Sequence, residues 1–300
     1  MSLCFSITVN AAELVVIYPQ VREPFARVFE EIVRGAEDGY HESPQPQNAG
    51  QQSTQRVSMD ENQSPVDFIH VLDQASPVLV LGNRLAGEVS AHNPEHKVIV
   101  GAVSTEYSNV FGITLTPGFK VIANKLSALV PAVRTVHVVV GSEADRVEFE
   151  TAAKVFAQRG LSLVVHPASD IRSAAAIYRG LTKQLNEDDA VWILPDGSFV
   201  GDAMLSILLQ ASWEKHFVVF SSNPVHVKRG ALFSIYPNNY KMGLSLGRLA
   251  QEVASGRVPQ RQMQPLDDVF VAVNGRTGNH LGINFTEDVL RHIDVVLPAR

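Results

Sequence analysis

The stretch that decides the fold spans residues 190–250 and reads AVWILPDGSFVGDAMLSILLQASWEKHFVVFSSNPVHVKRGALFSIYPNNYKMGLSLGRLA. An apolar run at 191–194 ends at a polar corner, and an amphipathic segment follows at 200–213. A second apolar run, 217–220, ends at the polar corner 221–223. Strand, corner, helix, strand and corner is the succession of a parallel sheet. Because open parallel sheets bind ligands outside the carboxyl ends of their strands, both corners are candidate binding positions.

Five short motifs lie within this block and just after it. They read Leu194-Pro195-Asp196, Phe220-Ser221-Ser222, Arg229-Gly230-Ala231-Leu232, Tyr240-Lys241-Met242-Gly243 and Gly256-Arg257-Val258-Pro259. In this order and spacing they resemble the C-terminal half of the ABC-transporter substrate-binding protein family whose best-known members bind tryptophan or tyrosine. The resemblance implies a type 1 periplasmic-binding fold. That fold is α/β, with two doubly wound Rossmann-like lobes joined by three crossovers and a ligand in the cleft.

The resemblance also implies a function. It indicates an extracytoplasmic solute-binding protein of an ABC importer, which captures a small polar metabolite such as an amino acid and has a membrane permease as its partner. The chain departs from the family at two corners. Residues 103–107 read Val-Ser-Thr-Glu-Tyr where members often carry Thr-Asp-Pro-Val, and residues 141–144 read Gly-Ser-Glu-Ala where members often carry Asn-Pro. The resemblance therefore leaves the identity of the ligand open.

Two other classes of function remain as alternatives. The same fold serves orphan ligand-sensing proteins, which have a sensor partner or form the ligand-binding core of a repressor and take no part in transport. An enzyme is the third class, and we do not expect one. The sequence contains neither a G-x-G-x-x-G loop after its first strand nor the Walker loop of phosphate-binding enzymes.

Length and composition agree with a two-lobed binding protein. The chain has 300 residues, of which 45% are hydrophobic and 19% charged, so it can bury substantial cores. With a net charge of -6, the chain lacks the excess of basic residues that is typical of nucleic-acid-binding proteins. No apolar run approaches the roughly 20 residues that a membrane span requires. We expect a monomer that binds a small molecule, no nucleic acid and no cofactor.

The first twelve residues, MSLCFSITVNAA, resemble the tail of a secretory signal. Residues 3–9 are mostly apolar, and Val9-Asn10-Ala11 fits a small-x-small cleavage pattern. We therefore predict a signal remnant at 1–12 and a bacterial, periplasmic location. The alternative is a frayed end before the first strand. Cys4 is the single cysteine, so no internal disulfide can form.

Alternation of apolar runs and amphipathic stretches restarts near Pro117, which predicts two lobes. The predicted parts are an N-terminal lobe at 13–115 plus 270–300, a C-terminal lobe at 116–235, and a crossover helix with its linker at 236–269. We place the three crossovers near 112–117, 232–236 and 269–274.

Local patterns predict the individual elements. Residues 14–18 read as a buried strand, and an apolar stripe from Phe25 predicts a helix that ends at Gly35. Residues 41–63 are rich in Gln, Ser, Asn and Pro, which predicts a loop with a short strand around Val57. Residues 275–282 are also predicted to form a loop.

Nine polar residues at strand-end corners form the predicted ligand site. Strand ends and helix starts present free N–H groups, and these side chains add donors and charges suited to a carboxylate or an ammonium group. In the alternative interpretation, Ser142, Asp196 and Ser222 are helix caps and nothing more. The nine residues are Gln20, Asn83, Ser104, Ser142, Glu143, Asp196, Ser221, Ser222 and Asn223.

Aromatic residues and histidines are weaker candidates. Four rings near the corners could stack on a ligand or fill the core, namely Tyr18, Tyr107, Phe199 and Tyr236. His92 and His96 are spaced as metal ligands on a helix, but Pro94 lies between them, so we predict no metal site.

Overall fold

The chain forms two compact units. The structure, a computed structural model of the 300 residues, describes residues 14–42, 54–70, 72, 76–92, 97–141, 143–195, 199–283 and 285–297. The N-terminal unit comprises Met1–Thr116 and Pro237–Asp268, and the C-terminal unit comprises Pro117–Tyr236 and Val269–Arg300. The chain therefore passes from one unit to the other three times, at the edges of the predicted crossovers. The predicted signal remnant lies outside the described residues.

A six-stranded sheet forms the middle layer of the N-terminal unit, in the order β11-β5-β4-β3-β1-β2. β1 pairs in parallel with β2 and β3, β3 with β4, and β4 with β5. Its central strands read as apolar runs because helices cover both faces of the sheet. The strands are β1 (Leu14–Pro19), β2 (Thr54–Met59), β3 (Val78–Leu81), β4 (Val98–Val103), β5 (Phe111–Pro117) and β11 (Met263–Leu266).

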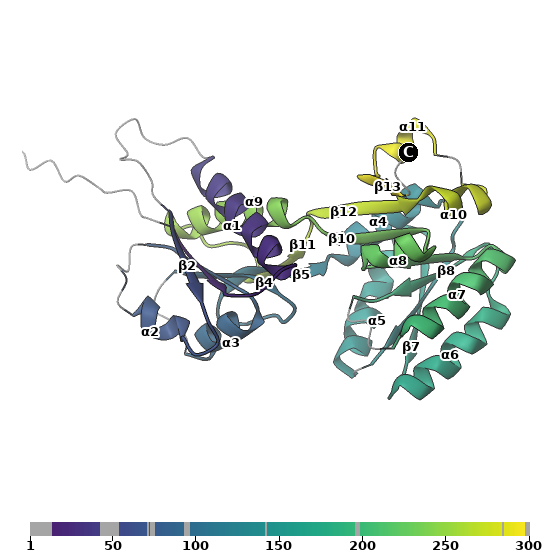
Figure 1. The fold of residues 1–300 in the computed structure, drawn as a ribbon, viewed down its shortest axis with the longest axis horizontal. Coiled ribbons are helices and arrows are strands. Elements are labelled where there is room, and N and C mark those ends of the chain that lie inside the picture. The colour runs from purple at the N-terminus through teal and green to yellow at the C-terminus, as the bar shows by residue number, and fades with distance from the viewer. Residues whose placement is uncertain are drawn as a thin grey trace, which may run out of the picture. The chain divides into compact units, whose positions relative to one another are not determined.

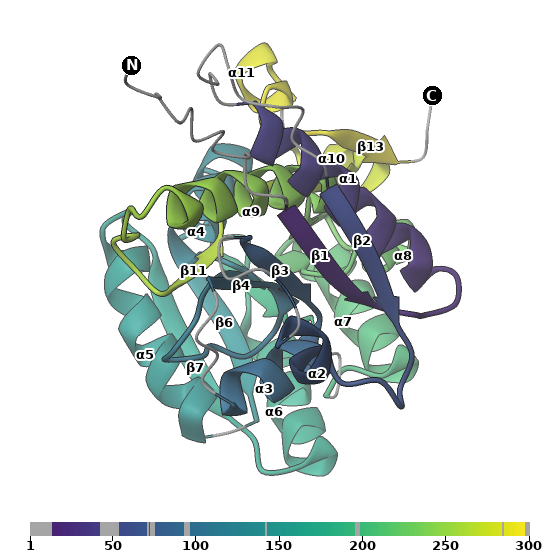
Figure 2. The same cartoon turned by 90° about the vertical axis from the view of Figure 1, so that its left-hand side faces the viewer.

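Two pairs of helices cover this sheet. α1 (Phe25–His41) and α9 (Asn239–Ala254) pack together on one face, while α2 (Pro65–Ile69) and α3 (Asn83–Ala91) lie on the other (Figures 1 and 2). The α2–α3 face encloses a core that includes Ile17, Val80 and Leu85.

α1 and α9 pack with their backbones in close contact. A Cβ added to Gly35 would lie 2.0 Å from the carbonyl oxygen of Tyr240, and one added to Gly243 would lie 2.1 Å from that of Ile32. The predicted helix end at Gly35 is therefore wrong. The helix continues to His41, and Gly35 is required for its contact with α9.

A seven-stranded sheet forms the middle layer of the C-terminal unit, in the order β13-β12-β10-β9-β8-β6-β7. β6 pairs in parallel with β7 and β8, β8 with β9, β9 with β10, and β12 with β13. The strands are β6 (Thr135–Val140), β7 (Ser162–Pro167), β8 (Asp189–Ile193), β9 (Val218–Ser221), β10 (Phe233–Pro237), β12 (Val269–Asn274) and β13 (Val295–Leu297).

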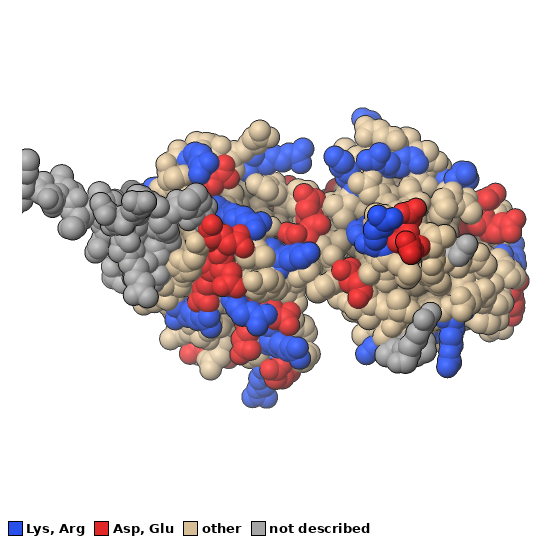
Figure 3. All heavy atoms as spheres, turned by 90° about the horizontal axis from the view of Figure 1, so that it is seen from above, with Lys and Arg blue, Asp and Glu red and all other residues tan. Residues whose placement is uncertain are grey.

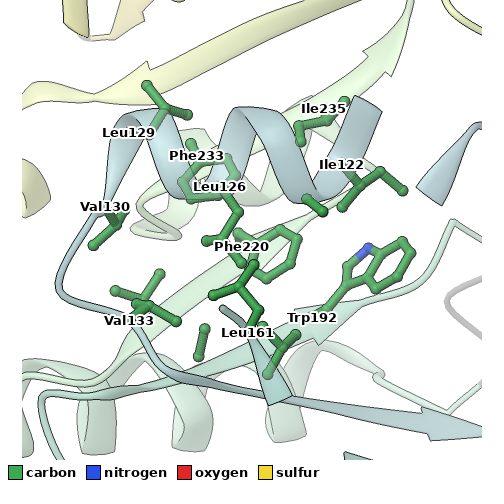
Figure 4. Close-up of a cluster of buried hydrophobic side chains, with 14 of the residues drawn as sticks. Ile122, Leu126, Leu129, Val130, Val133, Leu161, Trp192, Phe220, Phe233 and Ile235 are labelled. Carbon is green, nitrogen blue, oxygen red and sulfur yellow. The ribbon is translucent and has the colours of Figure 1, made fainter. Parts of the chain in front are cut away.

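Helices also cover both faces of the second sheet (Figure 1). One core contains Leu126, Trp192 and Phe220, with the rings of Trp192 and Phe220 stacked at 5.8 Å (Figure 4). The helices are α4 (Phe119–Leu129), α5 (Glu143–Ala157), α6 (Ile171–Gln184), α7 (Asp202–Lys215), α8 (Pro224–Arg229), α10 (Gly275–His280) and α11 (Glu287–Leu290).

The C-terminal residues differ from their predicted placement. We expected 270–300 in the N-terminal lobe, but Val269–Arg300 belongs to the C-terminal unit. The physical reason is strand pairing: β12 lies beside β10 in the second sheet, and the N–H of Asn274 donates to the carbonyl of Leu232 at 2.8 Å. The predicted loop at 275–282 is largely helical, because α10 begins at Gly275.

Candidate functional site

The first sheet changes winding direction between β1 and β3. β2 lies to one side of β1, and β3, β4 and β5 follow on the other. In such sheets the crevice outside the carboxyl ends of the two strands at this switch point is where ligands bind. A pocket of about 270 Å³ lies there, close to the lower end of the usual range for ligand sites, roughly 300–1,000 Å³. We call it the switch-point pocket.

The lining of the switch-point pocket combines an apolar wall with a polar edge. The ends of β1, β3 and β4, the start of α1 and the start of α3 supply it. The lining residues are Pro19, Val21, Phe25, Phe29, Leu81, Gly82, Asn83, Arg84, Leu85 and Ala102.

Asn83 and Ser104, both predicted from sequence, are brought together beside this pocket. The amide oxygen of Asn83 accepts from the Ser104 N–H at 2.8 Å, and its amide nitrogen donates to the Ser104 hydroxyl at 3.0 Å. The Tyr107 hydroxyl donates to the Asn83 carbonyl at 3.3 Å. Burial raises the pKa of Tyr107, so it remains a donor at neutral pH. These bonds fix the corners after β3 and β4 relative to each other.

Arg84 supplies a positive charge to the pocket lining. Its guanidinium donates to Glu88 at 2.8 Å, to the carbonyl of Asp60 at 2.8 Å and to the carbonyl of Gln63 at 3.2 Å. These three acceptors hold the side chain in one orientation. The side chain remains 38% exposed, so part of the cation faces solvent.

The backbone beside the pocket is unusual at two positions. Gly82, the residue before α3, has φ +89° and gives the helix no side-chain cap. Ala102 has φ +53°, a left-handed conformation that costs a non-glycine residue energy, and it coincides with a register shift between β4 and β5. Strained backbone of this kind is concentrated at binding sites.

These features give the pocket a defined binding chemistry. The amino end of α3 carries free N–H groups and the positive end of the helix dipole, and Arg84 adds a full charge. The phenyl rings of Phe25 and Phe29 offer an apolar surface. The arrangement suits a small molecule that has a carboxylate at one end.

Gln20, another residue predicted from the sequence, lies beside the pocket. It is exposed between two lining residues, and its N–H donates to the carbonyl of Met59 at 2.7 Å.

In the C-terminal unit, the corner after β9 is held by its own hydrogen bonds. The buried hydroxyl of Ser221 accepts from the Asn223 N–H at 3.0 Å and lies 2.8 Å from Nδ1 of His226. The Asn223 side chain accepts from the Val225 N–H at 2.9 Å and so caps α8. The cap of α8 is therefore Asn223, and not Ser222 as the capping alternative had it.

Ser222 is half-buried and bonded to a core residue. Its hydroxyl accepts from the indole Nε1 of Trp192 at 3.2 Å. Burial lowers the pKa of the nearby His226, and the charge of Arg229 lowers it further. The hydrogen bond between the Ser221 hydroxyl and Nδ1 of His226 completes the bonding of this corner.

The switch point of the second sheet lies between β6 and β8. The strand ends there lead to Ser142 and Asp196, both predicted ligand residues, which lie outside the described residues. Glu143 begins α5, but its side chain is not among those described. Phe199 lies against Gly141, since a Cβ on that glycine would be 2.6 Å from its ring.

None of the four aromatic residues predicted from the sequence is among the residues that line the switch-point pocket. Tyr107 and Phe199 both pack against buried cores, and Tyr236 contacts Phe270 at 5.8 Å between ring centroids. Tyr18 is half-buried near the end of β1. The rings that do line the switch-point pocket, Phe25 and Phe29, were not predicted. Their helical spacing indicated core packing instead.

Other kinds of site find little support in the described part of the chain. There, no group of three His, Cys, Asp or Glu side chains is arranged to hold a metal ion. None of the described helices combines the length and apolar character of a membrane span. Acidic and basic side chains are interspersed over the face shown in Figure 3.

Comparison with solved structures shows the same fold. The chain is similar to an ABC domain in complex with L-Trp from Streptococcus pneumoniae, with 16% identity, a TM-score of 0.56, and 96% of this chain and 100% of that chain covered. It is also similar to the ligand-free, open form of a substrate-binding protein with adhesive properties from Clostridium difficile, with 15% identity, a TM-score of 0.67, and 96% and 100% covered. A third similar structure is that of a conserved domain protein from Vibrio cholerae, with 16% identity and a TM-score of 0.53, and with 95% of this chain and 100% of that chain covered.

Comparison of sequences identifies the family. No curated protein sequence matches the chain. The family model described as "ABC transporter substrate binding protein" matches residues 98–296, which is about two thirds of the chain and includes both predicted corners of the opening block. The fold, the order of the motifs and this match agree, and the chain belongs to the ABC transporter substrate-binding protein family.

Proposed function

We propose that this protein is the extracytoplasmic solute-binding protein of an ABC importer and that it captures a small carboxylate-bearing metabolite, with amino acids as the first candidates. The observation that carries the proposal is the switch-point pocket in a chain of this family. The pocket lies where parallel α/β sheets bind ligands. Its polar edge combines the amino end of α3 with the half-exposed guanidinium of Arg84, which also pairs with Glu88.

The chemistry of the pocket favours an amino acid over a sugar or a cation. Arg84 and the amino end of α3 would bind the carboxylate, and Phe25 and Phe29 would contact an apolar side chain. The pneumococcal neighbour is a complex with L-Trp, which supports placing aromatic amino acids in the first set of compounds tested. Its low identity gives no further guide to the ligand.

A thermal-shift screen of the full chain tests this assignment. Amino acids, their amides, the corresponding amines, sugars and nucleosides should be compared at equal concentrations. A ligand that binds the folded state raises its stability by about 2.7 kcal/mol at a hundredfold excess over Kd. We expect one class of free carboxylates to give larger shifts than the matching amides give. Equal shifts with acids and amides would contradict the carboxylate assignment.

Transport requires a second experiment. In the source organism, deletion of the gene should abolish high-affinity uptake of the ligand that the screen identifies, and fractionation should place the protein outside the cytoplasm. Ligand binding with unchanged uptake, or a cytoplasmic protein, would instead indicate a ligand sensor of the same fold.

A further inference from the structure

A second cavity lies in the C-terminal unit, at the edge of its sheet where β8 and β9 begin. Its volume is about 500 Å³, within the roughly 300–1,000 Å³ typical of small-molecule sites. It opens at the amino ends of these strands and is therefore distinct from the corner at 221–223. Its apolar wall is formed by Leu129, Val130, Val218, Ile283 and Val289.

Two exposed carboxylates lie at the rim of this cavity. Glu187 and Asp188 line it and are solvent-exposed. Two cations lie nearby and are bonded to backbone carbonyls: the Arg134 guanidinium donates to the carbonyl of Pro131, a lining residue, at 2.7 Å, and Lys215 donates to the carbonyl of Lys183 at 2.7 Å. Among the described residues, neither Glu187 nor Asp188 has an ion-pair partner.

Helix dipoles add to the negative potential of the rim. α4 ends at Leu129, which lines the cavity, and α7 ends immediately before His216, which also lines it. A helix carboxyl end carries the negative end of the helix dipole and stabilises a nearby cation. Lys215 already offsets the dipole of α7, so the cavity combines an apolar interior with a rim at which two carboxylates and the end of α4 favour positive charge.

The aromatic side of the cavity is fixed in place. The ring of His216 stacks on that of His280 with 4.9 Å between centroids, and the ring of His280 stacks on that of Trp213 with 3.5 Å between centroids. His280 Nε2 also lies 2.7 Å from the carbonyl oxygen of Trp213. The stack therefore holds the ring of His216, a lining residue, in position.

We propose that this cavity binds a small organic cation, a primary amine with an apolar arm. The arm lies against Val130, Val218 and Ile283, and the ammonium group lies beside Glu187 and Asp188. Neither interaction involves the switch-point pocket, so this site is independent of the proposed transport ligand.

Phenethylamine and 3-phenylpropionate are matched probes, because they have similar apolar arms and opposite charges. We expect calorimetric titration of the full chain to show saturable binding of phenethylamine that an excess of 3-phenylpropionate, a carboxylate suited to the switch-point pocket, does not displace. The double variant Glu187→Gln/Asp188→Asn should weaken phenethylamine binding about tenfold, the loss expected for two water-exposed charge interactions. Glu61→Gln/Asp67→Asn removes the same two charges from the N-terminal unit and should leave binding unchanged.

A second pair of variants locates the site. Ala132 lines the cavity in an exposed turn, so Ala132→Lys places a cation at the rim without disturbing the core. We expect Ala132→Lys to abolish phenethylamine binding and Ala132→Gln to retain it. The proposal is wrong if phenethylamine does not bind at millimolar concentration, if 3-phenylpropionate displaces it, or if its binding is insensitive to the rim variants.

Discussion

Asn83 and Ser104 exchange two hydrogen bonds, one from the Ser104 N–H at 2.8 Å and one to the Ser104 hydroxyl at 3.0 Å. The two residues are 21 positions apart and follow neighbouring strands, β3 and β4. The pair therefore connects the two loops that border the switch-point pocket. Because these loops follow neighbouring strands, the order of the strands determines the shape of the pocket.

Loss of this connection should reduce both stability and ligand binding. Asn83→Ala removes two hydrogen bonds and is expected to lower the free energy of unfolding by about 1–2 kcal/mol, measured by urea denaturation. Asn83→Asp keeps an acceptor for the Ser104 N–H and adds a negative charge beside the pocket. Asn83→Asp should therefore largely preserve the stability of the protein and lower its affinity for a carboxylate ligand about tenfold. Unchanged affinity in Asn83→Asp would argue against a carboxylate at this position.

Ser222 can be distinguished as a ligand residue or a structural one. Ser222→Ala removes the acceptor of the Trp192 indole N–H, and Trp192 is only 3% exposed. Leaving that donor unpaired should lower the free energy of unfolding of the ligand-free protein by about 1–2 kcal/mol and change the tryptophan emission. If ligand binding falls while ligand-free stability is unchanged, the hydroxyl acts mainly on the ligand.

The backbone contact between α1 and α9 predicts a sharp contrast between two glycines. Gly243→Ala places a methyl group 2.1 Å from the Ile32 carbonyl oxygen and should destabilise the protein by about 2–3 kcal/mol. Gly180→Ala is the control, because a Cβ in the middle of α6 meets nothing within 4 Å. That substitution should stabilise the protein by up to about 1 kcal/mol. Similar effects of the two substitutions would disprove the close helix contact.

Buried histidines make stability depend on pH. Nδ1 of His137 lies 3.0 Å from Nε2 of His166, and Asp189 lies on the other side of His137 at 3.6 Å. Burial lowers the pKa of both histidines; Asp189 partly offsets this for His137, and the charge of His137 lowers the pKa of His166 further. As the pH falls below about 6.5, the unfolded chain takes up protons that the folded chain does not. Stability should therefore decrease below that pH and be fully present above it.

His166→Gln tests this dependence. Each histidine contributes at most about 1.4 kcal/mol per pH unit, so urea unfolding from about pH 7.5 to 5.5 should show a smaller loss in the variant than in the wild type. The carboxylates titrate alike in both proteins, which makes the difference specific to the histidine pair. Equal pH slopes in the two proteins would show that His166 protonates as readily in the folded state as in the unfolded state.

The central strands could be predicted from the sequence because burial on both faces leaves a continuous apolar run. Residues 78–81 and the run at 217–220 are examples, and they correspond to β3 and β9. Elements whose stability depends on distant partners could not be predicted. Gly35 resembles a helix end unless α9 is known to lie against it, and β12 reads as a strand without revealing which sheet it joins.

The polar residues of the candidate site could be predicted from the sequence, but its cationic and aromatic residues could not. Strand ends indicated Asn83 and Ser104, since polar residues after apolar runs mark the carboxyl edge of a parallel sheet. Arg84, Phe25 and Phe29 could not be predicted as pocket residues. Arg84 sits within an ordinary helical pattern, and the two phenylalanines belong to an apolar stripe that usually indicates core packing. Only the strand order brings α1 and α3 to the same switch point.

The most direct test of the central claim is a calorimetric titration of Arg84 variants with the carboxylate ligand identified by the screen. The account predicts that Arg84→Gln raises Kd about tenfold or more and that Arg84→Lys has a smaller effect. Arg248→Gln is the control and should leave Kd unchanged, because Arg248 lies on α9 and pairs with Glu42, beyond the end of α1 that is remote from the pocket. Equal Kd values for Arg84→Gln and Arg248→Gln would contradict a role of the switch-point pocket in binding the carboxylate.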